Sequence, residues 1–177
     1  MMSWHKITTP APMDLLVGFW DLTGYMRYCL KKPDDDVFRL MSEFFDLTGG
    51  IINDAGGRFV KAIGDAGLAA FPVGEADEGV RAFLKMKTEG EAMLCAQGVN
   101  SRSIVKLHVG PVIAGMVGAP GDKRFDIYGK TVNTAALLES KGFAMSPQVF
   151  RSLGKETRSL FKKHTPPVTY IHLDDRH

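Results

Sequence analysis

The chain has 177 residues, of which 45% are hydrophobic and 24% are charged, so length and composition predict one globular domain with a sizeable core. The 22 basic and 20 acidic residues leave a formal net charge of +2, which argues against the basic stripe of a nucleic-acid-binding protein. No apolar run reaches the roughly 18 residues that a membrane-spanning helix needs.

The first half of the chain alternates between strand and helix patterns. Residues 1–12 are polar and contain prolines, so they are interpreted as a short lead-in and not as a signal peptide. After Pro33, three aspartates precede apolar residues at helical spacing, and negative charge suits a helix N-terminus. The predicted elements are a strand over 13–22, a helix from 34 to about 55, strands over 58–63 and 67–71, and a helix over 76–96.

The second half adds shorter elements. Ser146 followed by Pro147 is typical of a helix N-cap and first helical residue. The predicted elements are strands over 103–109 and 111–117, helices over 131–140 and 146–153, and a closing strand over 168–173. The order β-α-β-β-α-β is that of a ferredoxin-like split βαβ sheet, so we expect a single α+β domain over 1–177 with helices on one face.

The two cysteines carry little chemistry. Cys29 and Cys95 are far apart and match no metal-ligand spacing. They predict two reduced thiols in a cytoplasmic protein.

Two aspartates stand at predicted strand–loop junctions. Asp21 ends the first strand, and Asp65 lies in the turn between residues 63 and 67. Neighbouring strands of a split βαβ sheet would bring both carboxylates to one edge, where they could bind hard cations such as Mg²⁺. Taken singly, Asp21 is better interpreted as a turn cap and Asp65 as a hairpin-loop residue, and only the pair in these contexts favours metal binding.

Four blocks together resemble the catalytic domain of class III adenylyl and guanylyl cyclases. They are Phe19 to Tyr25 (FWDLTGY), Lys61 to Phe71 (KAIGDAGLAAF), His108 to Gly115 (HVGPVIAG) and Phe125 to Ser140 (FDIYGKTVNTAALLES). The similarity extends from about residue 15 to residue 173. The resemblance implies a hairpin dimerisation arm after the third block, and a phosphorus–oxygen lyase of cyclic-nucleotide signalling that works at a dimer interface.

The resemblance also implies a two-metal site. Asp21, Asp65 and the carbonyl of Leu22 would bind two Mg²⁺ or Mn²⁺ ions, which activate a ribose 3′-hydroxyl and hold the phosphates. The amides of Thr23, Gly24 and Tyr25 would face phosphate. Because the chain carries both halves of the family's site, it is expected to form a homodimer, or a heterodimer with another cyclase-like domain.

Lys61 and Asp126 match the family positions that contact the purine edge. A lysine donor suits adenine N1 and a carboxylate acceptor suits the adenine 6-amino group, so ATP is the predicted substrate and 3′,5′-cyclic AMP with pyrophosphate the products. Outside the family context, the favoured interpretation is that Lys61 is a solvated strand residue and that Asp126 caps a turn.

The remaining assignments concern ribose and phosphate. Asn133 matches the residue that orients the ribose, and Lys162 or Lys163, with Lys163 preferred, loosely matches the lysine that holds the terminal phosphates. The family's transition-state arginine corresponds to Leu137, which has no donor. The alternative is therefore a catalytically weak or inactive domain that binds nucleotide or regulates a partner. His108 is assigned a packing or hydrogen-bonding role.

Overall fold

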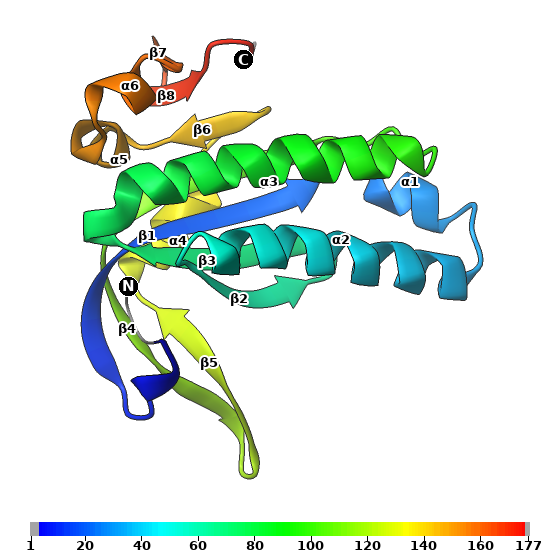
Figure 1. Ribbon diagram of the computed structural model, residues 1–177, viewed down its shortest axis with the longest axis horizontal. Coiled ribbons are helices and arrows are strands. Elements are labelled where there is room, and N and C mark those ends of the chain that lie inside the picture. Colours follow the sequence, from blue (N-terminus) through cyan, green and yellow to red (C-terminus); the bar gives the residue numbers. More distant parts are fainter. Residues whose placement is uncertain (1–3, 176–177) are drawn as a thin grey trace.

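One mixed sheet of eight strands organises the chain in the computed structural model, which describes residues 4–175 (Figure 1). The strands follow the order β2-β3-β1-β4-β6-β8-β7, and β5 pairs with β4. Their bounds are β1 Ala11–Leu22, β2 Arg58–Ile63, β3 Ala66–Pro72, β4 Ser103–Ala119, β5 Asp122–Tyr128, β6 Phe143–Met145, β7 Phe161–His164 and β8 Thr169–His172. The predicted α+β split βαβ sheet is confirmed.

The strand β1 lies between β3 and β4 and is antiparallel to both. Leu15, Leu16 and Val17 are fully buried, because successive side chains enter the cores on opposite faces of the sheet. The register places Trp20 opposite Gly67 of β3 and opposite Val105 of β4.

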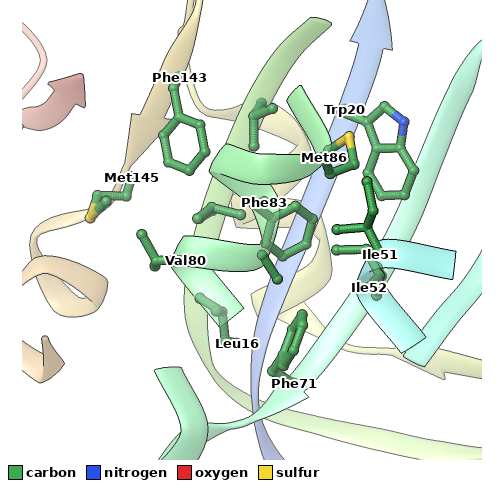
Figure 2. Close-up of a cluster of buried hydrophobic side chains, with 14 of the residues drawn as sticks. Leu16, Trp20, Ile51, Ile52, Phe71, Val80, Phe83, Met86, Phe143 and Met145 are labelled. Atoms are coloured by element: carbon green, nitrogen blue, oxygen red, sulfur yellow. The ribbon is translucent and has the colours of Figure 1, made fainter. Parts of the chain in front are cut away.

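The larger core lies between the sheet and two long helices, α2 (Asp34–Asp54) and α3 (Ala76–Ala96) (Figure 1). Figure 2 shows how Phe83 and Met86 of α3 face Leu16 and Trp20 of β1. The helix α2 begins after Pro33 with three aspartates in its first turn, as the sequence predicts. Within residues 4–175, neither these helices nor the shorter ones are long and apolar enough to cross a membrane.

The helix α4 (Lys130–Leu137) packs on the other face of the sheet. Its Ala135 is fully buried in a second core with Leu15 and Val17 of β1 and Phe125 of β5. The expectation that all helices share one face therefore does not extend to α4. It ends three residues earlier than predicted, since Leu138 takes an extended backbone conformation.

Other boundaries also differ from the sequence prediction. Instead of two strands broken at Gly110, β4 is one strand of 17 residues, because β1 pairs with residues 103–114 and β5 with residues 113–119. The unpredicted elements include α1 (Tyr25–Cys29), α6 (Lys155–Arg158), β6 and β7, each too short to show periodicity. The strand β5 was also absent from the predicted elements, although it has seven residues. The predicted helix over 146–153 appears as α5 (Pro147–Ser152), with Ser146 as its N-cap.

The Trp20–Gly67 pair generates a stability prediction. A Cβ at Gly67 would stand 2.2 Å from the Trp20 ring, which is fully buried, so Gly67→Ala must displace the indole. We expect the free energy of unfolding to fall by about 1–3 kcal/mol in urea denaturation. The matched control is Gly50→Ala in α2, where a Cβ meets open space and helix propensity predicts a gain of about 0.5–1 kcal/mol. A neutral Gly67→Ala would contradict this packing.

A second prediction concerns His108 of β4, whose Nδ1 lies 2.8 Å from the Oγ of Ser146, the α5 N-cap. Partial burial lowers the pKa of His108 below its ordinary 6.5, so the unfolded chain binds the proton more tightly. Stability is therefore lost as the pH falls below about 6.5. In melts from pH 7.5 to 5, His108→Gln should lose less stability than the wild type; equal losses would rule out a His108 contribution.

Candidate active site

The end of β1 and the β2–β3 turn bring Asp21 and Asp65 to the same edge of the sheet. The β1–β3 ladder runs to Trp20 opposite Gly67, so the next residue along β1 lies beside the turn that contains Asp65. Gly64 supplies the left-handed backbone of that turn, with φ of 64°. The expected meeting of the two strand ends is therefore present, while metal binding by the two aspartates stays a prediction.

Asp21 is electrostatically coupled to its neighbours. Its side chain reaches solvent, yet the surrounding protein displaces enough water to raise its pKa above the ordinary 3.8. The positive charge of Lys106 opposes this shift, and the negative charge of Asp65 adds to it. A cation placed between two carboxylates would relieve their repulsion.

Tyr25 lies close enough to Asp65 to be affected by its charge. Partial burial raises the pKa of Tyr25 to about 12, and a hydrogen bond with Cys29 and the charge of Asp65 act in the same direction. The phenol is thus a neutral hydroxyl at physiological pH, with Cys29 as its neighbour.

The donor set suits a nucleotide-bound metal better than a closed protein cage. Across residues 4–175, no three or more His, Cys, Asp or Glu side chains gather closely enough to hold an ion by themselves. Two carboxylates and a backbone carbonyl are hard oxygen ligands, which Mg²⁺ and Mn²⁺ accept together with water and phosphate. Asp21, Leu22 and Asp65 fit that role.

A cavity of about 120 Å³ opens beside Asp21, on the sheet face that carries α4. Its walls come from β1, β3, β4 and α4: Phe19, Trp20, Asp21, Ala66, Ile104, Lys106 and Ala136. The sequence analysis did not identify Lys106 as a site residue. The alternating pattern of residues 103–109 predicted a strand there, but only the β1–β4 register places Lys106 next to Asp21.

The expected phosphate contacts are only partly available. The Thr23 amide donates to the carbonyl of Arg102 at 2.9 Å, and the Thr23 hydroxyl accepts from the Arg102 amide at 3.0 Å. The Thr23 amide is therefore paired with the loop before β4, and its expected phosphate contact stays a prediction that would require this amide to change partner. The adjacent Gly24 has φ of 73° and precedes α1, which Tyr25 begins.

The two lysines of β7 lie far from the carboxylates of their own chain. The strand β7 is the edge strand at the opposite end of the sheet order from β2, which borders the Asp65 turn. The Lys162 ammonium donates to the carbonyl of Leu173 at 2.6 Å, while Lys163 is exposed. Any contact of Lys163 with phosphate therefore requires a second chain.

The expected base-binding residues do meet. The Lys61 ammonium on β2 lies 2.6 Å from Oδ2 of Asp126 on β5, and Oδ1 of Asp126 accepts from the Ile127 amide at 2.8 Å. Both side chains line a hollow of about 590 Å³ between β2 and the β4–β5 hairpin. Asp126 is largely buried and Lys61 about two-fifths exposed, so the pair is held at the wall of an open space.

The outer face of α4 carries the last expected site residues. Asn133 is exposed, and Leu137, one turn further on, is 81% exposed. A bare leucine on a helix surface provides no charge for a phosphate. Both residues point away from the cores and could act only on something bound from outside.

The comparisons with known proteins agree with this arrangement. Residues 13–165 match the family described as the adenylate and guanylate cyclase catalytic domain. The germination-specific adenylate cyclase of Dictyostelium discoideum is 29% identical over 154 residues, covering 79% of this chain and 18% of that protein. Retinal guanylyl cyclase 2 of Bos taurus is 29% identical over 161 residues, covering 85% and 14%.

A solved structure shares the fold. The adenylyl cyclase CyaB from P. aeruginosa superposes with a TM-score of 0.80 at 18% identity, covering 95% of this chain and 97% of that one. The chain spans less than a fifth of either curated relative, one of which is named an adenylate cyclase and the other a guanylyl cyclase. The match over residues 13–165 shows that the chain belongs to the adenylate and guanylate cyclase catalytic domain family.

Proposed function

We propose that two copies of the chain convert ATP into 3′,5′-cyclic AMP and pyrophosphate, with two Mg²⁺ or Mn²⁺ ions per site, in cyclic-nucleotide signalling. The observation that carries the proposal is the Lys61–Asp126 pair in the wall of the 590 Å³ hollow. It puts one cationic donor and one anionic acceptor side by side in a space large enough for a purine.

The polarity of that pair favours adenine over guanine. Adenine offers an acceptor at N1 and a donor at its 6-amino group, which Lys61 and Asp126 complement; guanine offers N1–H and O6, the reverse. Because Asp126 is also fixed by the Ile127 amide, the carboxylate keeps its place when the lysine turns to a base. The substrate assignment rests on this complementarity.

The carboxylate pair supplies the other half of the chemistry. Bound metal ions would polarise the α-phosphate and lower the pKa of the ribose 3′-hydroxyl. Asp21 and Asp65 would hold those ions at the edge where β1 and the β2–β3 turn meet, and Asn133 would orient the ribose. The cyclisation forms the bond from the 3′-oxygen to the α-phosphorus and breaks the bond from that phosphorus to pyrophosphate.

The surface around α4 supports assembly of two copies. Exposed apolar side chains stand on the β4–β5 hairpin, which projects from the body of the protein (Figure 1), and another stands on α4. They are Ile113, Val117, Tyr128 and Leu137, which are 46–81% exposed. A partner covering them would bring its own Asn133 toward the opposite carboxylates, so a homodimer supports two composite sites. A heterodimer with another cyclase-like chain would use the same surface.

The direct test is product formation. Purified protein with Mn²⁺ and ATP should yield cyclic AMP by mass spectrometry, with less product from GTP, and Asp65→Ala should lower the rate at least 100-fold because a metal carboxylate is lost. The matched control is Asp14→Ala, at the other end of β1. Product from the wild type at no more than the Asp65→Ala level would refute an ATP cyclase.

Leu137 favours a second candidate function, a domain that binds nucleotide or regulates a partner with little turnover. Its exposed side chain has no hydrogen-bond donor for the charge that grows on the α-phosphate. We expect Leu137→Arg to raise the rate about 10²–10³-fold, the usual worth of one preorganised stabiliser. Leu137→Met is the matched control. If the arginine leaves the rate unchanged, the missing donor is not what limits this chain.

A further inference from the structure

Lys106 is the basic residue that lines the cavity beside Asp21. It lies on β4 opposite Phe19, on the same sheet face as Asp21, so the two residues are diagonal neighbours across the β1–β4 ladder. Its ammonium donates to the carbonyl of Ala136 in the last turn of α4 at 3.2 Å. The positive end of the side chain is thus held between the end of α4 and the first carboxylate.

The Lys106 ammonium has capacity left for a ligand. An ammonium has three donors, of which the Ala136 carbonyl takes one. In the part of the chain that the structure describes, no carboxylate lies within ion-pair distance of it, although its charge partly opposes the burial that raises the pKa of Asp21. It therefore influences Asp21 through the cavity without being bound to it.

We propose that Lys106 binds the phosphate groups of the nucleotide that occupies this site. The inference rests on the proposed function, since it requires a nucleotide whose phosphates meet the metal-binding carboxylates. A phosphate oxygen beside Asp21 gains a charge-assisted hydrogen bond from the ammonium. Leu137 on α4 has no hydrogen-bond donor. The positive charge at this cavity therefore comes from the Lys106 ammonium on β4.

The position of Lys106 has a consequence that separates it from a structural residue. With no nucleotide present, a positive charge near Asp21 repels a divalent ion that seeks the same carboxylate. With nucleotide present, the same charge attracts the phosphates. Removing it should strengthen the binding of metal alone and weaken the binding of metal with nucleotide, whereas a packing defect would weaken both.

The test compares Lys106→Met, which keeps the length of the side chain, with Lys106→Arg and with the control Lys85→Met. Lys85 lies on α3 with its side chain 62% exposed. Titration calorimetry measures Mn²⁺ alone, then 3′-deoxy-ATP, which cannot cyclise, in saturating Mn²⁺. Lys106→Met should bind Mn²⁺ about 3- to 10-fold more tightly and the analogue about 10-fold more weakly. Lys106→Arg should retain most of the analogue affinity, and Lys85→Met should match the wild type.

The outcomes separate the two proposals. If the wild type binds Mn²⁺ and the analogue, and Asp65→Ala abolishes Mn²⁺ binding, but Lys106→Met behaves like Lys85→Met, the inference fails and the proposed function stands. If both affinities of Lys106→Met fall together, the role of Lys106 is structural and the inference is again wrong. If the wild type binds neither probe, the proposed function fails and the inference with it.

Discussion

The antiparallel pairing of β1 with β3 on one side and β4 on the other is the constraint on which the candidate site depends. The β3 ladder brings the Asp65 turn beside Asp21, and the β4 ladder puts Lys106 diagonally across from the same aspartate. A slip of one residue in either ladder would turn the side chains to the opposite face and separate these charges. Packing on the opposite face of β1 supports this register, since the buried Trp20 ring lies against Gly67, where a Cβ would collide with it.

The two faces of the sheet differ in how completely they are packed. The face under α2 and α3 contains the larger core and a fully buried set of aromatic and aliphatic side chains (Figure 2). The face under α4 has a smaller core, and beside it lies the cavity at Asp21. The larger core is thus on the face opposite this cavity, which leaves Asp21 and Lys106 on the less filled side of the sheet.

The sequence predicted those parts of the fold whose patterns are long. The helices α2 and α3, each of 21 residues, show a full apolar stripe, and the β2–β3 turn is marked by Gly64. Segments of three to six residues, such as α1 and β6, gave no such pattern. In the site, the nearness of Asp21 to Asp65 and of Lys61 to Asp126 followed from motifs. The occupied amide of Thr23 and the place of Lys106 did not, because both depend on contacts with β4 and the loop before it, far away in the chain.

The Lys61–Asp126 ion pair in the wall of the 590 Å³ hollow would also limit which bases the proposed site accepts. Lys61 and Asp126 contact each other, so a base bound there would have to offer both groups better partners than they already have. A molecule that matches only one of them would separate two opposite charges and leave the second uncompensated. Discrimination between bases would then depend on the free energy needed to separate Lys61 from Asp126 as well as on the contacts that each base makes afterwards.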